Sequence, residues 1–259
     1  MNILKADRPQ LSFSKASERY EESSDLQKRI GIDLLSRIPG KKTYLSILDV
    51  GMGTGWLTER IGIKFPDARL FGVDLAPGMV LAAKDKNIDV VLQADAQSLP
   101  FEDSSFDLVV SNCAYQWVND LEKAFASSRR VLRQEGDFYF SCFGKQTLKE
   151  LWASFKNVSR DSILRDERWD SLDQNYVFNT LASSGFKDID VCREIEEIKF
   201  DDMFDLIRWL KTIGANQVKR SAFVGRDILN QANKFYQDHY SDGKRICASF
   251  EVIKAKARK

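Results

Sequence analysis

Apolar and polar positions along the chain follow two periods in turn, which predicts a fold that alternates strands with helices. Short apolar runs, each suited to a strand buried on both faces, are separated by segments in which apolar residues recur at helical spacing. The predicted strands of this part of the chain are 46–50, 70–74, 90–93, 106–112 and 138–142. Strands that alternate with helices form a parallel sheet covered on both faces, so we predict a doubly wound α/β fold.

The rest of the chain adds helices and two further strands to this pattern. A sixth strand is predicted to begin at 189–192, a helix spans 202–213, and a final strand spans 246–252. Between about 146 and 173, apolar residues at helical spacing and a charged stretch predict a lid inserted over the cleft. Within a single domain, 1–259, the predicted parts are a helical cap (1–40), a ligand-binding core (41–145), the lid (146–185) and a part that completes the sheet with a substrate-side helix (186–259).

Composition and charge exclude several classes of function. The 259 residues suffice for one α/β domain with an insertion. Because 39 basic and 38 acidic residues nearly cancel, no strong field favours nucleic acid. No apolar run approaches the ~20 residues that span a bilayer, and the first residues are too polar for a signal peptide, which predicts a cytoplasmic protein. The four scattered cysteines are typical of reduced thiols, and the single histidine, His239, disfavours a histidine metal site or a hydrolase triad.

One apolar run ends near a carboxylate and continues into a glycine-rich turn. Asp49 lies at the end of the run 46–50, and Gly51, Gly53 and Gly55 follow it. Glycine supplies backbone freedom in such a turn and leaves the main chain open to a ligand. The spacing G-x-G-x-G differs from the G-x-G-x-x-G of dinucleotide sites, and no Lys-Ser or Lys-Thr pair follows, which excludes a P-loop.

A second carboxylate stands where a ribose-binding acid belongs. Asp74 ends the run 70–74, about 20 residues after the glycines, and one carboxylate suits the two hydroxyls of a ribose. Together, the strand-end acid, the glycine turn and Asp74 resemble the class I S-adenosylmethionine-dependent methyltransferases. Met52 stands where that family more often has a small residue or cysteine. The resemblance implies a Rossmann-like, seven-stranded, mostly parallel sheet that uses S-adenosylmethionine and releases S-adenosylhomocysteine.

The resemblance also implies roles for individual residues. In that family the first acid and the glycine turn surround the methionine moiety, and the second acid holds the ribose. An acid after the third strand, here Asp95, bonds the adenine amine. The implied cofactor-binding residues are Tyr20, Asp49, Gly51, Gly53, Gly55, Asp74, Leu75, Met79, Asp95, Ala96 and Asn112. No metal is implied.

Further stretches narrow the resemblance to one methyl acceptor. They are Phe13-Ser14-Lys15-Ala16 with Tyr20, Leu26-Gln27, the run 111–117 that contains Gln116-Trp117, and the run 209–216. Over nearly the whole chain, these stretches resemble the malonyl-acyl carrier protein O-methyltransferases of biotin synthesis. The resemblance implies methyl transfer to the free carboxylate of a malonyl thioester, giving a methyl ester that primes pimelate synthesis. The implied partner is acyl carrier protein carrying malonate, with neither nucleic acid nor membrane.

The implied reaction needs no general base. A malonyl carboxylate is ionised at pH 7 and is already a nucleophile, so its alignment in a cleft without water suffices. We expect Arg208 and Lys211 to hold this carboxylate and Tyr20 and Trp117 to shape the pocket, which makes these four the candidate catalytic residues. The residues expected to receive the carrier are Lys123, Arg129, Arg130, Arg133 and Lys145.

Two other functions remain open. A methyltransferase for a small free carboxylic acid or for a quinone would share the cofactor site, although methylation of a ring carbon is expected to use a base. A regulator that binds the cofactor but catalyses no reaction would share the same site as well.

Overall fold

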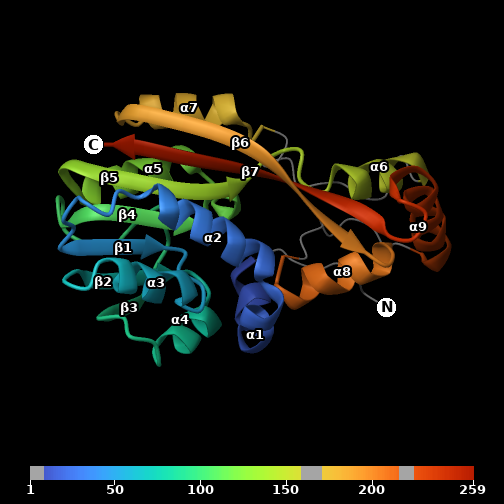
Figure 1. The fold of residues 1–259 in the computed structure, drawn as a ribbon, viewed down its shortest axis with the longest axis horizontal. Coiled ribbons are helices and arrows are strands. Elements are labelled where there is room, and N and C mark those ends of the chain that lie inside the picture. The colour runs from blue at the N-terminus through green and yellow to red at the C-terminus, as the bar shows by residue number, and fades with distance from the viewer. Residues whose placement is uncertain (1–8, 159–170, 216–224) are drawn as a thin grey trace.

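The sheet has seven strands in the order β3-β2-β1-β4-β5-β7-β6 (Figure 1). This computed structural model describes residues 9–158, 171–215 and 225–259. The strands are β1 (Ser46–Val50), β2 (Arg69–Asp74), β3 (Val90–Gln93), β4 (Phe106–Asn112), β5 (Leu132–Phe143), β6 (Lys187–Phe200) and β7 (Ile246–Arg258). β1 to β5 pair in parallel, and β7 pairs antiparallel with β5 and β6. The predicted seven-stranded, mostly parallel sheet is confirmed.

Helices cover both faces of this sheet. They are α1 (Pro9–Ser23), α2 (Asp25–Arg37), α3 (Trp56–Lys64), α4 (Pro77–Ala83), α5 (Leu121–Val131), α6 (Lys149–Val158), α7 (Gln174–Ser183), α8 (Met203–Thr212) and α9 (Arg226–Tyr240), with a short 3-10 helix at Tyr115–Trp117. Successive residues of β1 point to opposite faces, so Leu48 packs toward α5 and α7 while Ile47 packs toward α2 and α3. Within the described ranges, no helix has both the length and the apolar composition needed to cross a membrane.

The last two strands extend the sheet beyond its parallel part (Figure 1). β6 has 14 residues and β7 has 13, whereas β1 has 5. A second apolar core forms at their far end, where Phe250 and Val252 of β7 meet Leu210 of α8 and Tyr236 of α9. The antiparallel pair β6 and β7 therefore connects two apolar cores.

The segment predicted as a lid, 146–185, contains two helices with different neighbours. α6 packs against α9 and β7 at the extended end of the sheet. α7 packs instead beside α5 on the sheet, with Val177 and Leu181 buried in the main core. Residues 159–170 of the predicted lid lie outside the described residues. α7 is therefore a sheet-covering helix, and α6 is the described helix of this segment that lies near the cleft.

Helix α9 is not among the elements predicted from the sequence, although its apolar residues recur at helical spacing. Its buried residues, Leu229, Ala232 and Tyr236, stand among polar side chains and are covered because α6 and β7 pack against this helix. The last turn carries His239, which is exposed and stacks on Phe235. The spacing of its apolar residues is therefore a signal from which this helix could have been predicted.

Helix α8 ends against α1 at Gly214. The amide of Ala215 donates to the carbonyl of Leu210, as in a Schellman motif. Gly214 has a φ of +75°, and an added Cβ would lie 3.0 Å from the Cα of Phe13. The glycine therefore allows both the turn and the close approach of the two helices.

Replacing Gly214 by alanine is expected to destabilise the protein by about 1–3 kcal/mol, because Ala disfavours positive φ and its Cβ would push against α1. Gly40→Ala is the matched control, since an added Cβ there would contact only the Lys64 Cε, at 3.9 Å. Urea unfolding measures both variants. Equal midpoints for the two would contradict the packing described for Gly214.

Candidate functional site

A cavity of about 480 Å³ lies at the carboxyl ends of β1, β2, β3 and β4. Parallel α/β sheets bind their ligands at this edge. The predicted site residues that line it are Tyr20, Gly51, Gly53, Asp74, Leu75, Met79, Asp95, Ala96, Asn112 and Trp117. The fold thus brings together residues from loops that are far apart in the sequence.

The glycine turn has the left-handed backbone that its residues permit. Gly51, Gly53 and Gly55 have φ of +73°, +59° and +83°. An added Cβ at Gly51 would lie 2.2 Å from the Cβ of Ala114. At Gly53 the nearest atom is Cε1 of Tyr20, 4.0 Å away, so a side chain there would enter the cavity. Gly55 does not line the cavity; it is the N-cap residue of α3, and its cofactor role stays a prediction.

Asp74 joins β2 to the glycine turn. Its Oδ2 accepts from the amide of Gly53 at 2.9 Å, and its Oδ1 accepts from the amide of Ala76 at 2.8 Å. Burial raises the pKa of this carboxyl, and the two amides oppose that shift. Each carboxylate oxygen keeps a further lone pair, so Asp74 can also accept from two ligand hydroxyls. The arrangement fits a ribose.

Asp95 is oriented by Gln97, which the sequence analysis did not identify. The amide of Gln97 donates to Oδ1 of Asp95 at 2.9 Å, and its Nε2 lies 3.1 Å from each carboxylate oxygen. Oε1 of Gln97 accepts from the amide of Asp120, which ties the pair to the start of α5. Asp95 therefore presents a fixed acceptor in the cavity wall, suited to an exocyclic amine.

Asp49 lies beneath the glycine turn and does not line the cavity. It is 1% exposed, and its Oδ2 accepts from the Thr58 hydroxyl at 2.6 Å. Its Oδ1 is buried without a hydrogen-bond partner among the described residues. Burial, with a smaller contribution from Asp74, raises the pKa of Asp49 to about 7. Asp49 is therefore buried behind the cavity wall, and its contact with the cofactor stays a prediction.

Helix α1 forms a wall of the cavity. Phe13 and Tyr20 line it, and the ring of Phe13 packs edge-on against Trp117 with centroids 5.4 Å apart. The amide of Gly78 donates to the Ser14 hydroxyl, and an added Cβ at Gly78 would lie 2.4 Å from the Ser14 carbonyl oxygen. The missing side chain at Gly78 therefore lets α1 lie directly on the start of α4.

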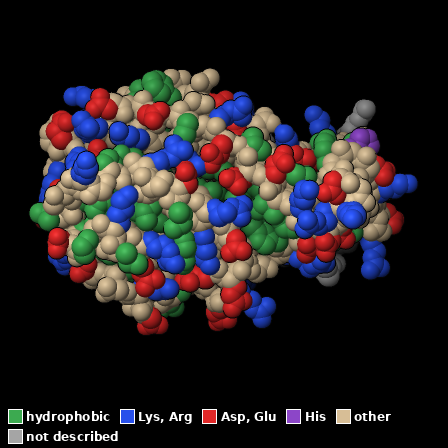
Figure 2. Space-filling model, viewed as in Figure 1, with side chains coloured by type: hydrophobic (Ala, Val, Ile, Leu, Met, Phe, Trp, Pro, Cys, Tyr) green, Lys and Arg blue, Asp and Glu red, His purple; other side chains and the backbone are tan. Residues whose placement is uncertain are grey.

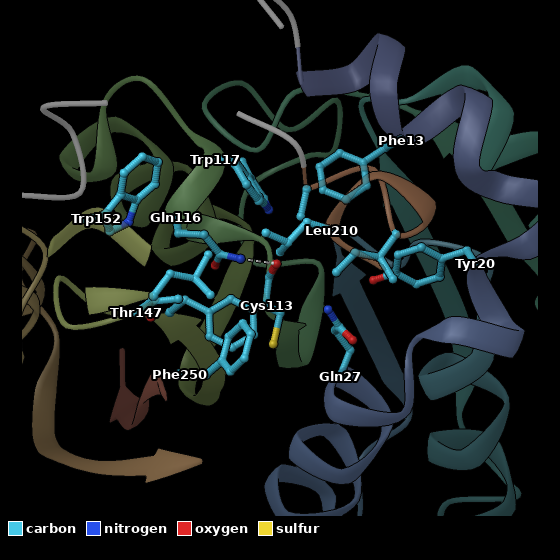
Figure 3. Close-up of a pocket in the computed structure, with 14 residues that line it drawn as sticks. Phe13, Tyr20, Gln27, Cys113, Gln116, Trp117, Thr147, Trp152, Leu210 and Phe250 are labelled. Carbon is cyan, nitrogen blue, oxygen red and sulfur yellow. Dashed lines mark hydrogen bonds between the residues drawn. The ribbon is translucent and has the colours of Figure 1, made fainter. Parts of the chain in front are cut away.

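A narrower cavity of about 60 Å³ adjoins the first (Figure 3). Phe13, Tyr20, Cys113 and Trp117 line both cavities. The other residues around the narrow cavity are Gln27, Gln116, Phe143, Thr147, Leu148, Trp152, Leu210, Ile213, Ala215 and Phe250. No charged side chain occurs in this lining, as far as the structure describes it. The narrow cavity therefore suits an uncharged chain attached to the group that reacts.

The two basic residues predicted to hold the substrate carboxylate line neither cavity. Arg208 has an exposed side chain that pairs with Asp205 at 3.2 Å, one turn away on α8. Helical geometry explains this outcome, since α8 turns its apolar side, including Ile207 and Leu210, toward the second core. Arg208 consequently faces outward, and Lys211 lies half-buried at the edge of that side.

The basic residues expected to receive the carrier bond within the chain. Their partners are Asp120 for Lys123, the Gly185 carbonyl for Arg129, the Leu99 and Phe101 carbonyls for Arg130, Asp107 for Arg133 and Asp173 for Lys145. Figure 2 shows acidic and basic side chains interspersed over the face that it draws. Each of these side chains therefore has a partner within the chain, and their contact with the carrier stays a prediction.

Sequence comparison identifies relatives of this chain. The model of a methyltransferase domain matches residues 48–140, which contain the glycine turn and the three acids. The chain is 34% identical over 254 residues to the malonyl-[acyl-carrier protein] O-methyltransferase of Geobacter sulfurreducens, covering 93% of this chain and 94% of that protein. It is 38% identical over 212 residues to the protein of the same name from Hahella chejuensis, covering 80% and 74%.

Solved structures share the fold. The YcgJ protein of Bacillus subtilis superposes with a TM-score of 0.60 and 21% identity, covering 89% of this chain and 97% of that one. Phosphoethanolamine N-methyltransferase 2 of Haemonchus contortus, solved with S-adenosyl-L-methionine, gives 0.56 and 21%, covering 88% and 52%. At these identities the likeness shows the architecture alone.

The raised pKa of Asp49 predicts a pH-dependent stability. Between the ordinary value of 3.8 and about 7, the folded state holds a proton that the unfolded state has lost, so this group lowers stability as pH rises through that window. Asp49→Asn should therefore gain stability relative to the wild type between pH 4 and 7, by an amount on the order of a few kcal/mol. Urea unfolding without ligand at pH 4, 5.5 and 8 measures this difference.

Asp67→Asn is the control for the Asp49 variant, because Asp67 is exposed. Its stability relative to the wild type should not change across the same pH range. If the difference in stability between Asp49→Asn and the wild type does not change with pH either, the raised pKa assigned to Asp49 is contradicted.

Proposed function

Because the chain belongs to the family of malonyl-[acyl-carrier protein] O-methyltransferases, we propose that it methylates the free carboxylate of a malonyl thioester on acyl carrier protein. S-Adenosylmethionine supplies a methyl group bound to a positively charged sulfur and is converted to S-adenosylhomocysteine. The methyl ester primes pimelate synthesis for biotin, in the cytoplasm.

The observation that carries this proposal is the junction of two cavities of different character. The wide cavity has fixed carboxylates, Asp74 and Asp95, whose free lone pairs suit the ribose and the adenine amine. The narrow cavity is mostly apolar. Tyr20 and Trp117 line both, so the methyl donor and the acceptor carboxylate meet beside them. We therefore propose a catalytic role for both residues, as the sequence predicts.

The chemistry of the described lining residues agrees with a nucleophile that needs no base. His239, the chain's single histidine, is exposed on α9 and lines neither cavity. Burial raises the pKa of the Cys113 thiol to about 12, so Cys113 stays protonated and does not compete for the methyl group. A carboxylate, in contrast, is ionised at neutral pH and attacks without losing a proton.

Tyr20 is the donor that we assign to the acceptor carboxylate. Burial, with smaller contributions from Cys113 and Asp74, raises the pKa of its phenol, so Tyr20 keeps its proton at neutral pH. Its hydroxyl points toward the residues around the narrow cavity (Figure 3). A donor at this position orients the carboxylate without neutralising it, and orientation in a site without water is the main requirement of this reaction.

The alternatives differ in what they require of the narrow cavity. A small free acid would fill only the junction, and the apolar residues from α6, α8 and β7 would then have no part in its recognition. Methylation of a quinone ring carbon would require a base, and the described linings of the two cavities contain no histidine. A regulator that binds cofactor without turnover would need no acceptor cavity.

Turnover with three acceptors tests the proposal. The protein is incubated with S-adenosylmethionine and with malonyl carrier protein, free malonate or a quinone, and mass spectrometry follows a +CH₂ product. We expect product on malonyl carrier protein at a kcat/KM far above that for free malonate. Product only from free acids, or cofactor binding without any product, would refute the assignment.

Asp74→Ala is expected to weaken binding of S-adenosylmethionine by about 1–3 kcal/mol, or roughly 5- to 150-fold in Kd, through loss of the ribose contact. Asp67→Ala, a change of the same kind at an exposed position, should bind normally. Isothermal titration calorimetry measures both variants. An unchanged Kd for Asp74→Ala would remove Asp74 from the cofactor site.

A further inference from the structure

Two buried glutamines in the narrow cavity carry oxygens without hydrogen-bond partners. Gln27 on α2 is 8% exposed and Gln116 is 4% exposed, and both line the cavity (Figure 3). Oε1 of each is buried and accepts no hydrogen bond from any described residue. A buried carbonyl without a donor costs free energy, so two of them in one cavity indicate that a ligand supplies the donors.

The surroundings fix the side-chain amide of Gln116 and the backbone of Gln27. Nε2 of Gln116 donates to the Cys113 carbonyl at 2.6 Å. Because this bond identifies the nitrogen of the amide, the end without a partner is the oxygen. The backbone carbonyl of Gln27 accepts from Nδ2 of Asn112 at 2.9 Å, and Oδ1 of Asn112 accepts from the Ser141 hydroxyl at 2.7 Å. The free oxygen of Gln116 therefore belongs to a side-chain amide of fixed orientation, and Gln27 is held through its backbone beside β4 and β5.

The character of these groups decides which part of a substrate they receive. Amide oxygens carry partial negative charge, so they repel a carboxylate and attract N–H donors. A malonyl carboxylate is consequently disfavoured beside these oxygens, and we place it at the junction beside Tyr20 and Trp117. The apolar walls leave room for a thin chain that carries N–H groups.

We propose that Gln27 and Gln116 accept hydrogen bonds from amide N–H groups of the arm that links the malonyl thioester to its carrier protein. This inference rests on the proposed function, because acyl groups on carrier proteins are thioesters of an arm that contains amide bonds. The two glutamines are then specificity-determining residues. They favour an acyl group on its arm over a free acid, since only the arm satisfies their buried oxygens.

A series of malonyl thioesters tests this inference. Malonyl ethyl thioester has no amide, malonyl-N-acetylcysteamine has one, and malonyl-pantetheine has two. The wild type should show a kcat/KM that rises along the series. Gln27→Leu and Gln116→Leu are expected to lose about ten-fold on the amide-containing thioesters and at most two-fold on the ethyl thioester.

Controls separate recognition from folding. Gln231→Leu, a change of the same kind at an exposed position on α9, should match the wild type on all three thioesters. The thermal midpoint of Gln27→Leu should equal or exceed that of the wild type, because the change removes a buried oxygen without a partner. Gln27→Leu is the decisive variant if Gln116→Leu loses stability with the bond to Cys113.

The outcomes distinguish this inference from the proposed function. If both variants lose the same factor on all three thioesters, or lose none, the glutamines do not read the amides, and the inference fails while wild-type turnover still supports the function. If the wild type methylates neither malonyl carrier protein nor any thioester of the series, the proposed function fails, and the inference fails with it.

Discussion

The hydrogen bond from the Gly53 amide to Asp74 is the constraint on which the site depends. It spans 2.9 Å and joins the turn after β1 to the end of β2, so the cavity wall is one connected unit. The bond requires a turn of left-handed residues that lack side chains, and Gly51 and Gly53 satisfy that requirement. Asp49 joins the end of β1 to α3 through the Thr58 hydroxyl, and its second oxygen is buried without a donor among the described residues.

The second core explains how a common nucleotide fold acquires an acceptor site. β6 and β7 continue past the parallel strands, and the helices that cover their far ends supply the outer wall of the narrow cavity. Phe250 and Leu210 belong to this extension, whereas Cys113 and Trp117 follow β4 of the parallel part. The acceptor cavity thus lies where the two cores meet, and the cofactor cavity belongs mainly to the first core.

Local patterns predicted the parallel strands and most of the wide cavity, because strand ends, glycines and strand-end acids are adjacent in the sequence. Other features depend on contacts between distant segments. The orientation of α8, which turns Arg208 outward, follows from packing in the second core. The link from Gln97 to the amide of Asp120 likewise joins distant segments, whereas the bond from Gln97 to Asp95 is local. The separate position of α7 has the same cause, since only tertiary packing distinguishes a covering helix from a lid.

The position of helix α1 affects how both cavities are enclosed. Its aromatic rings, Phe13 and Tyr20, belong to both cavities at once, and its backbone rests on Gly78 at one contact and on Gly214 at another. One helix therefore forms a wall of both cavities, and any displacement of it would change the enclosure of the two together.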